Sequence, residues 1–182
     1  WQINWASGED AYPGGNPQAG AGRTRSDDSQ KRCEVAEITE KSLRDVLEVR
    51  RALEELAVRL ACDKISEEKI QELKEAAEYF QSTLKSGDIT KIAEADVKFH
   101  DVIYLATDNQ KLIQLLSNLG EQMYRYRVEY LKRSDFHQQL IDEHEEIIQT
   151  IETGQKDKAA KVVCQHVDNQ VEAVIDTNPD KK

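Results

Sequence analysis

Apolar residues recur every three or four positions through most of this chain, beginning near residue 43. A repeat of about 3.6 residues is typical of helices that bury one face. Breaks rich in Gly, Ser, Asp and Asn divide the pattern, and no run alternates convincingly as a strand does. We therefore predict an all-α fold, an antiparallel bundle of about six helices. The predicted helices cover residues 43–62, 67–84, 89–106, 110–132, 135–152 and 157–175.

Residues that favour helix ends lie at several of these boundaries. Ser42, Ser66, Asp88 and Ser134 are candidate N-caps, because their side-chain oxygens can accept hydrogen bonds from the first backbone N–H groups of a helix. Gly154 can adopt the left-handed conformation that ends a helix. The last two predicted helices should therefore form an antiparallel hairpin around Gly154.

The first 34 residues differ from the rest of the chain. They hold five of the eight glycines and two of the three prolines, and no helical or strand repeat is visible. Such a composition buries too little apolar surface to order itself. We predict a disordered or non-native segment at 1–34, a helical domain at 35–176 and a short tail at 177–182.

The charge and the cysteine content restrict the possible binding partners and the cellular compartment. The chain has 25 basic and 35 acidic residues, a net charge of −10, which disfavours a nucleic-acid surface because phosphate binding needs clustered positive charge. Its three cysteines form no CxxC motif or disulfide pattern, which suits a reducing compartment. No apolar run approaches the ~20 residues that span a bilayer, and no signal peptide is visible. We expect a soluble cytoplasmic protein with no membrane contact.

Four side chains could meet around one divalent metal ion. Asp96 and His100 are four positions apart, so they share one face of a helix. His144 lies ten residues before Gly154 and His166 lies twelve after it, so the hairpin would bring both nearly level. Three imidazoles and one carboxylate suit Zn, Ni or Mn. The alternative is that each histidine is a surface residue or a satisfied core residue.

Enzymatic interpretations find less support in the sequence. The His100-Asp101 dipeptide is found in HD-type phosphohydrolases, but those need another histidine upstream, and none precedes His100. The Glu-x-x-His pairs of di-iron bundles and the Gly-x-Ser-x-Gly elbow are absent from the sequence. A metal-dependent hydrolase on a helical bundle remains the alternative, although no general base is evident.

Arginines in apolar helical stretches could have either of two roles. Arg50 stands four before Glu54, and this spacing favours a surface ion pair worth only tenths of a kcal/mol. The alternative is a guanidinium that points into the bundle and holds an anion. Arg125 and Arg127 present the same choice. His137 is two turns, about 10 Å, from His144 and is interpreted as a non-ligand.

Several motifs resemble those of a known family. Residues 43–54 resemble the opening helix of the FCD ligand-binding domain, found in the FadR branch of GntR-type bacterial transcription regulators. Residues 96–100 are similar to its Asp-x-x-Phe-His motif. Residues 106–112 resemble its Ala-Thr-Gly-Asn-x-x-Leu break, with Asp108 in place of the usual glycine. Residues 143–166 resemble its last hairpin, and the likeness covers about residues 35–176.

This resemblance implies a function. It implies an FCD-like bundle in which Asp96, His100, His144 and His166 bind a divalent metal. It also implies a small organic acid effector near Arg50, for which Arg125 and Arg127 are further candidates. Residues of these kinds would bind a metal and an effector and would not catalyse a reaction, so we expect that the protein is not an enzyme.

The resemblance also implies partners. Family members form homodimers and bind DNA through a winged helix-turn-helix of about seventy residues, which residues 1–34 do not resemble. We therefore expect a homodimer whose DNA contact depends on a domain absent from this sequence. A chain at −10 without that domain should have no sequence-specific affinity for DNA.

Overall fold

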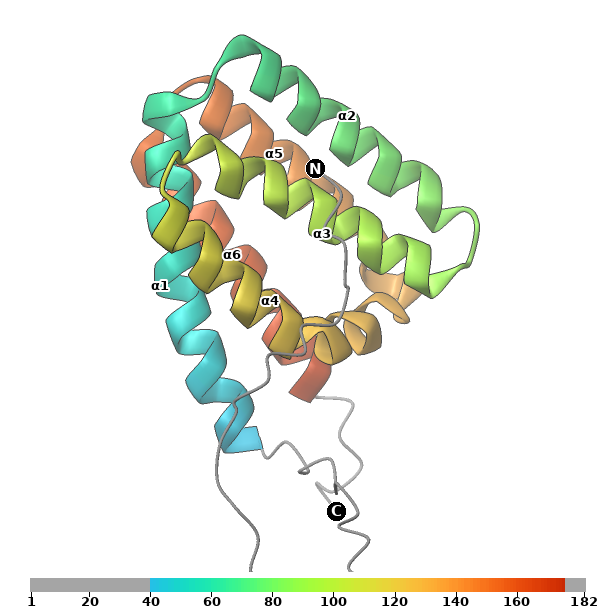
Figure 1. Ribbon diagram of the computed structural model, residues 1–182. Helices are drawn as coiled ribbons and strands as arrows, with labels where there is room; N and C mark the ends of the chain where they lie inside the picture. The colour runs from blue at the N-terminus through green and yellow to red at the C-terminus, as the bar shows by residue number, and fades with distance from the viewer. Residues whose placement is uncertain (1–39, 176–182) are drawn as a thin grey trace, which may run out of the picture. The chain divides into compact units, whose positions relative to one another are not determined.

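A computed structural model of the protein describes residues 40–175, with side chains described at 41 and 43–170. Within that range the chain is helical and has no strand, which confirms the predicted all-α fold (Figure 1). The expected disordered segment at 1–34 and tail at 177–182 lie outside the described residues. The elements are α1 Glu40–Lys64, α2 Glu67–Leu84, α3 Ile89–Ala106, α4 Gln110–Leu131, the 3₁₀ turn η1 Ser134–Phe136, α5 His137–Glu152 and α6 Lys156–Ile175.

Side-chain caps define the start of the three helices in the middle of the chain. The Ser66 hydroxyl accepts a hydrogen bond from the backbone N–H of Lys69, and the Asp88 carboxylate accepts from two backbone N–H groups at the start of α3. Asn109 does the same for α4 through the N–H of Leu112. These bonds satisfy donors that a helix leaves free at its N-terminus.

Two predicted caps are wrong. Ser42 lies inside α1, which begins two residues earlier at Glu40. Ser134 begins the 3₁₀ turn η1, and no side-chain bond caps that turn. The predicted fifth helix is therefore divided into η1 and α5.

The turn between α3 and α4 shows why a glycine is usual there. Asp108 has a φ of 48°, in the left-handed region that L-residues seldom adopt. Aspartate tolerates this region better than most residues. The substitution of Asp108 for the glycine of the resembled motif therefore preserves the turn.

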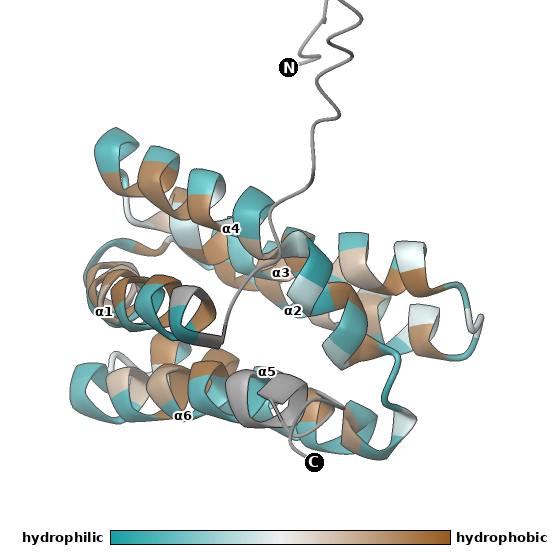
Figure 2. Cartoon of the chain, turned by 90° about the horizontal axis from the view of Figure 1, so that it is seen from below, coloured by the Kyte–Doolittle hydropathy of each residue, from teal (hydrophilic) through white to brown (hydrophobic). Residues whose placement is uncertain are grey.

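Helices α1 and α3 each pack against several others. Helix α1 lies along α6, α2 along α3, and α3 also contacts α4 and α1. Figure 2 shows α5 and α6 below α2, α3 and α4, with α1 at one side. No described helix is apolar and long enough to cross a membrane.

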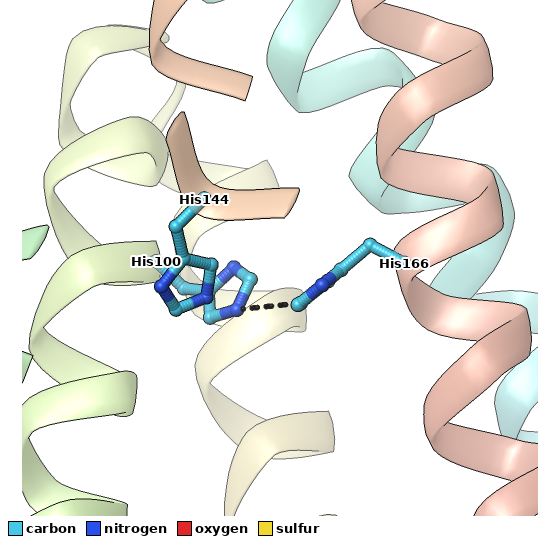
Figure 3. A group of neighbouring side chains, drawn as sticks. All are labelled: His100, His144 and His166. Atoms are coloured by element: carbon cyan, nitrogen blue, oxygen red, sulfur yellow. Dashed lines mark hydrogen bonds between the residues drawn. The ribbon is translucent and has the colours of Figure 1, made fainter. Parts of the chain in front are cut away.

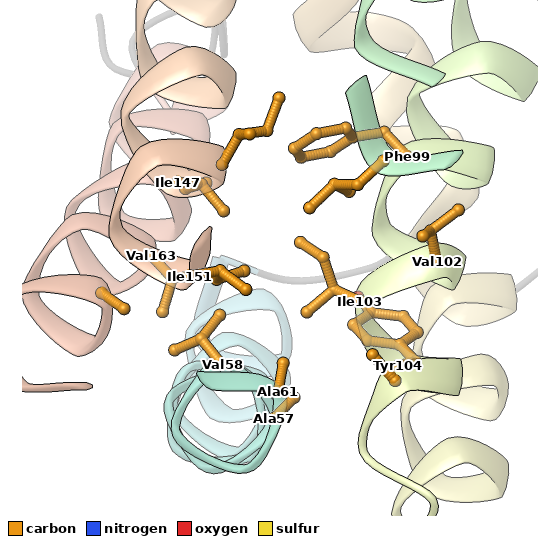
Figure 4. Close-up of a cluster of buried hydrophobic side chains, with 14 of the residues drawn as sticks. Ala57, Val58, Ala61, Phe99, Val102, Ile103, Tyr104, Ile147, Ile151 and Val163 are labelled. Atoms are coloured by element: carbon orange, nitrogen blue, oxygen red, sulfur yellow. The ribbon is translucent and has the colours of Figure 1, made fainter. Parts of the chain in front are cut away.

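Apolar stripes of all six α-helices meet in the main core, part of which is drawn in Figure 4. Phe99 and Ile103 of α3 are fully buried there, as is Val58 of α1. Because the same face of α3 carries Asp96 and His100, the packing that forms this core also buries those two polar side chains. The core residues labelled in the figure are Ala57, Val58, Ala61, Phe99, Val102, Ile103, Tyr104, Ile147, Ile151 and Val163.

Candidate metal and effector site

Three histidines from three helices converge in the interior. His100 of α3, His144 of α5 and His166 of α6 each offer a ring nitrogen, and these nitrogens lie within 4.8 Å of one another (Figure 3). All three side chains are at most 1% exposed. The Nε2 atoms of His100 and His166 are 3.3 Å apart. An ion about 2.1 Å from each nitrogen needs nitrogens roughly 3–4 Å apart, and the His100–His166 pair has this spacing.

Glu143 fixes the tautomer of His166. The Nδ1 atom of His166 lies 2.7 Å from Glu143 Oε2, and an ionised carboxylate only accepts, so Nδ1 carries the proton. Burial alone would raise the pKa of Glu143, but His166 and the hydrogen bonds from Gln139 and Asn169 together outweigh burial and lower it. His166 Nε2 therefore turns a lone pair toward the other imidazoles. A histidine oriented by a carboxylate in this way is typical of metal ligands.

Aromatic rings hold His144 in place. Its imidazole stacks on Phe99 with centroids 3.9 Å apart, and the Phe80 ring lies 4.9 Å from it. Neither ring nitrogen of His144 has a hydrogen-bond partner among the described residues. Packing therefore orients this ring and leaves both nitrogens available.

Asp96 lies beside one of the three histidines. Its Oδ1 is 3.4 Å from His144 Nε2, and its Oδ2 is 3.0 Å from Arg127 Nη1. The contact with Arg127 is an ion pair by distance, but its angles do not make a hydrogen bond, so both oxygens keep free acceptor capacity. Burial alone would raise the pKa of Asp96, but Arg127 and His144 hold it well below its usual range.

Three of the four predicted ligands, the histidines, form a group that could hold one ion, whereas Asp96 lies outside that group and contacts only His144 of the three. Asp96 Oδ1, His100 Nδ1 and both nitrogens of His144 are buried polar atoms without a hydrogen bond in the part of the chain described. Such atoms are rare in protein interiors unless they have another partner. Three imidazoles and a carboxylate are also a donor set that Zn, Ni and Mn accept.

Arg50 lies inside the bundle, so the predicted surface location of its ion pair is wrong. The pair with Glu54 forms, with Arg50 Nε 3.2 Å from Glu54 Oε1, but Arg50 is only 3% exposed. Tyr104 donates its hydroxyl proton to the same Glu54 oxygen. Burial lowers the pKa of Arg50, but Glu54, Tyr104 and Asp96 together outweigh burial and raise it, so the guanidinium stays protonated. Its Nη1 donates to Gln170 Oε1 at 3.1 Å.

The two candidate arginines on α4 differ. Arg127 is 6% exposed, whereas Arg125 lies on the exposed face. Arg127 lines two cavities, one of about 540 Å³ beside His100 and Tyr104, and one of about 10 Å³ beside Arg50 and Gln170. Arg125 lines neither cavity. The structure thus brings Arg50 and Arg127 to the site and leaves Arg125 on the surface.

His137 stands apart from the cluster, since its Nε2 lies 2.8 Å from the backbone oxygen of Leu131. Sequence reasoning missed Glu143 and Gln170 as partners of His166. A signal for each was present: Glu143 is nearly level with His166 across Gly154, and Gln170 is one helical turn after His166.

The buried imidazoles make stability depend on pH. Burial is the largest cause that lowers the pKa of both His100 and His144 in the folded protein. Below pH 6.5 the unfolded chain therefore binds more protons, and the free energy of unfolding should fall as pH drops. If both rings stay neutral, the loss is about 2.7 kcal/mol per pH unit. Asp96 has a lowered pKa, so the stability it adds above about pH 4 is lost only below that value.

Urea unfolding of chelator-treated protein between pH 7 and 5 measures this dependence. A His137→Gln variant should keep the slope, because His137 lies outside the cluster. A flat profile over this range would contradict the assignment of His100 and His144 as buried neutral rings.

Comparison with known proteins places the fold. A family model of the FCD domain matches residues 45–169. The uncharacterised HTH-type transcriptional regulator YdhC of Bacillus subtilis is 24% identical over 146 residues, which cover 80% of this chain and 65% of YdhC. The gluconate operon transcriptional repressor of the same organism is 26% identical over 137 residues, 72% of this chain and 56% of the repressor. The chain thus spans only 65% and 56% of these relatives.

Solved structures share the architecture. Escherichia coli McbR/YncC superposes with a TM-score of 0.72 at 17% identity, covering 78% of this chain and 72% of that one. A GntR-family regulator from Pseudomonas syringae pv. tomato gives 0.60 at 19% identity, covering 75% and 56%. The family model confirms the resemblance of the motifs. With a matched segment that covers most of the helical bundle, the chain belongs to the FCD domain family.

Proposed function

We propose that this chain is the ligand-sensing domain of a GntR-type transcription regulator and that it senses a small organic acid at a divalent metal centre. The observation that carries the proposal is the group of three buried histidines, one of which has its tautomer set by Glu143. The names of both curated relatives, a transcriptional regulator and a repressor, support the regulatory role.

His100, His144, His166 and Asp96 are the proposed metal ligands. Asp96 Oδ1 faces His144 while Oδ2 faces Arg127, so one oxygen can ligate an ion while the other keeps its ion pair. A bound Zn, Ni or Mn ion would supply a positive charge that attracts an anionic ligand. The protein groups orient that ligand and exclude water from it.

The larger cavity is the proposed effector site. Its volume of about 540 Å³ lies in the range of small-molecule pockets. Two buried side chains on its wall, His100 and Arg127, would place a carboxylate between the metal centre and a guanidinium. Guanidinium groups hold carboxylates through two parallel hydrogen bonds. One relative is named as the repressor of the gluconate operon, and gluconate is itself a small carboxylate.

The position of the proposed ligands supports a role in controlling DNA binding. They come from α3, α5 and α6, so an effector bound there favours one packing of these helices. The shift is limited by the difference in effector affinity between the two packings. We propose that the complete regulator is a homodimer and that a separate DNA-binding domain reads this shift.

Calorimetry tests the proposal. Gluconate, lactate, succinate and citrate are titrated into Zn-loaded protein and into protein stripped with a chelator. We expect at least one acid to bind the loaded protein and none to bind the stripped protein. Equal affinity in both samples would remove the metal from the mechanism, and turnover of ester substrates would favour a hydrolase.

A further inference from the structure

The orientation of the Gln170 amide is fixed by its neighbours. Gln170 is 7% exposed, with Oε1 3.1 Å from Arg50 Nη1 and Nε2 3.0 Å from His166 Nε2. A guanidinium has only donors, so the amide oxygen must face Arg50. The amide nitrogen then faces His166, and the usual ambiguity between oxygen and nitrogen does not arise.

The bond from Gln170 uses the lone pair that a metal would need. Because His166 Nδ1–H donates to Glu143, Nε2 is the accepting nitrogen and has a single lone pair. His166 cannot accept a hydrogen bond from Gln170 and ligate an ion through that lone pair at the same time. Gln170 therefore competes with metal binding, beside His100, whose Nε2 lies 3.3 Å from the same nitrogen.

Donors without acceptors surround Gln170 on its other side. It lines the small cavity together with Arg50, Arg127 and Tyr130. Arg50 Nη2, Arg127 Nε and the Tyr130 hydroxyl are buried there without a hydrogen-bond partner among the described residues. The cavity, at about 10 Å³, has room for about one water-sized group. An oxygen atom that accepts hydrogen bonds would satisfy these donors.

We infer that Gln170 is a two-position gate between metal and effector. When no ion is bound, its amide N–H donates a hydrogen bond to the lone pair of His166 Nε2. When His166 ligates an ion, the amide N–H turns to one oxygen of the effector carboxylate, which enters the small cavity from the large one past Arg127, a residue that lines both. Left without an acceptor, a buried N–H is costly, so the ion and the carboxylate each tighten the binding of the other. This inference rests on the proposed function and names Gln170 as a positioning residue within it.

Metal affinity in a Gln170→Leu variant tests the gate. Zn²⁺ affinity is measured by competition with a chromophoric chelator, with and without acetate as the carboxylate probe. Without acetate, the variant should bind Zn²⁺ roughly threefold to tenfold more tightly than wild type, because the competing hydrogen bond is gone. The gain in Zn²⁺ affinity that acetate gives wild type should largely disappear. A merely structural role for Gln170 predicts weaker Zn²⁺ binding, the opposite sign.

A matched control uses the same chemical change on the surface. Gln138 is exposed on α5 and bonds Asp142, so Gln138→Leu should leave both affinities unchanged. A second variant, Gln170→Glu, cannot donate to His166 when ionised and adds a negative charge. It should bind Zn²⁺ more tightly and acetate more weakly than wild type.

Nitrogen-15 NMR of wild-type protein tests the gate without mutation. The side-chain amide resonances of Gln170 should shift when Zn²⁺ is added and shift again with acetate. Unmoved amide resonances would overturn the inference, as would a folded Gln170→Leu variant with unchanged or weaker Zn²⁺ affinity. Acetate coupling that survives in that variant, which has no amide, would also overturn it. The wild-type amide would then turn to another acceptor, for example Glu54 Oε2, which has no hydrogen-bond partner among the described residues. A wild-type protein that binds no Zn²⁺ would overturn the proposed function as well.

Discussion

Replacing His144 or His166 with alanine should weaken Zn²⁺ binding by more than 100-fold. Each substitution removes one of the three nitrogens that lie within 4.8 Å of one another. Loss of a group that only orients a ligand already costs about 10–100-fold in metal affinity, and a ligand itself should cost more. Glu143→Gln should accordingly fall in that smaller range, because Glu143 acts through His166. Chelator competition measures all of these affinities.

The control for this prediction is His137→Ala. That histidine bonds a backbone oxygen away from the cluster, so its loss should leave Zn²⁺ affinity unchanged. Circular dichroism shows whether each variant keeps the helical fold. Full Zn²⁺ occupancy in folded His144→Ala protein would refute the ligand assignment.

Replacing Arg127 with leucine should destabilise the chelator-treated protein by about 3–5 kcal/mol. The reason is that Asp96, at most 1% exposed, would keep its charge without its ion-pair partner. Arg125→Leu, two residues away on the exposed face of α4, should change stability by less than about 0.5 kcal/mol. Urea unfolding of both variants at pH 7 compares them directly.

A double variant identifies the cause. Adding Asp96→Asn to Arg127→Leu removes the unpaired charge and should recover a large part of the lost stability. If Arg127→Leu costs no more than Arg125→Leu, the ion pair contributes nothing to the fold. If the double variant recovers nothing, the loss comes from packing and not from charge.

The register of the hairpin could be read from the sequence because it depends on one turn. Gly154, with a φ of 65°, forms the turn that follows α5. Once a turn is placed at this glycine, residue counting alone predicts that His144 and His166 are nearly level. The motif at Asp96 and His100 likewise needed only the helical repeat. Which carboxylate orients which ring could not be read, because this depends on the rotation of α5 against α6. Glu143, and not a more distant acid, satisfies that geometry.

Arg125 and Arg127 show a second limit on what a single sequence can predict. Residues 127 and 125 are about 200° apart around a helix, so at most one could face inward. Arg127 continues the buried stripe of α4 formed by Leu112, Leu116, Met123 and Tyr130. A charged residue in an apolar stripe is easily taken for a surface residue, since its partner is invisible in a single sequence. Asp96, the partner that makes the burial possible, comes from another helix.

The origin of the three histidines in three helices also affects how long the protein survives. Unfolding of α3, α5 or α6 would separate the proposed ligands and release a bound ion. An ion present at about 100 times its Kd adds about 2.7 kcal/mol to the free energy of unfolding, which lowers the unfolded population about 100-fold. Cellular proteases act on that population when opening and closing are fast. Metal supply would then set the amount of sensor in the cell as well as its ability to bind an effector.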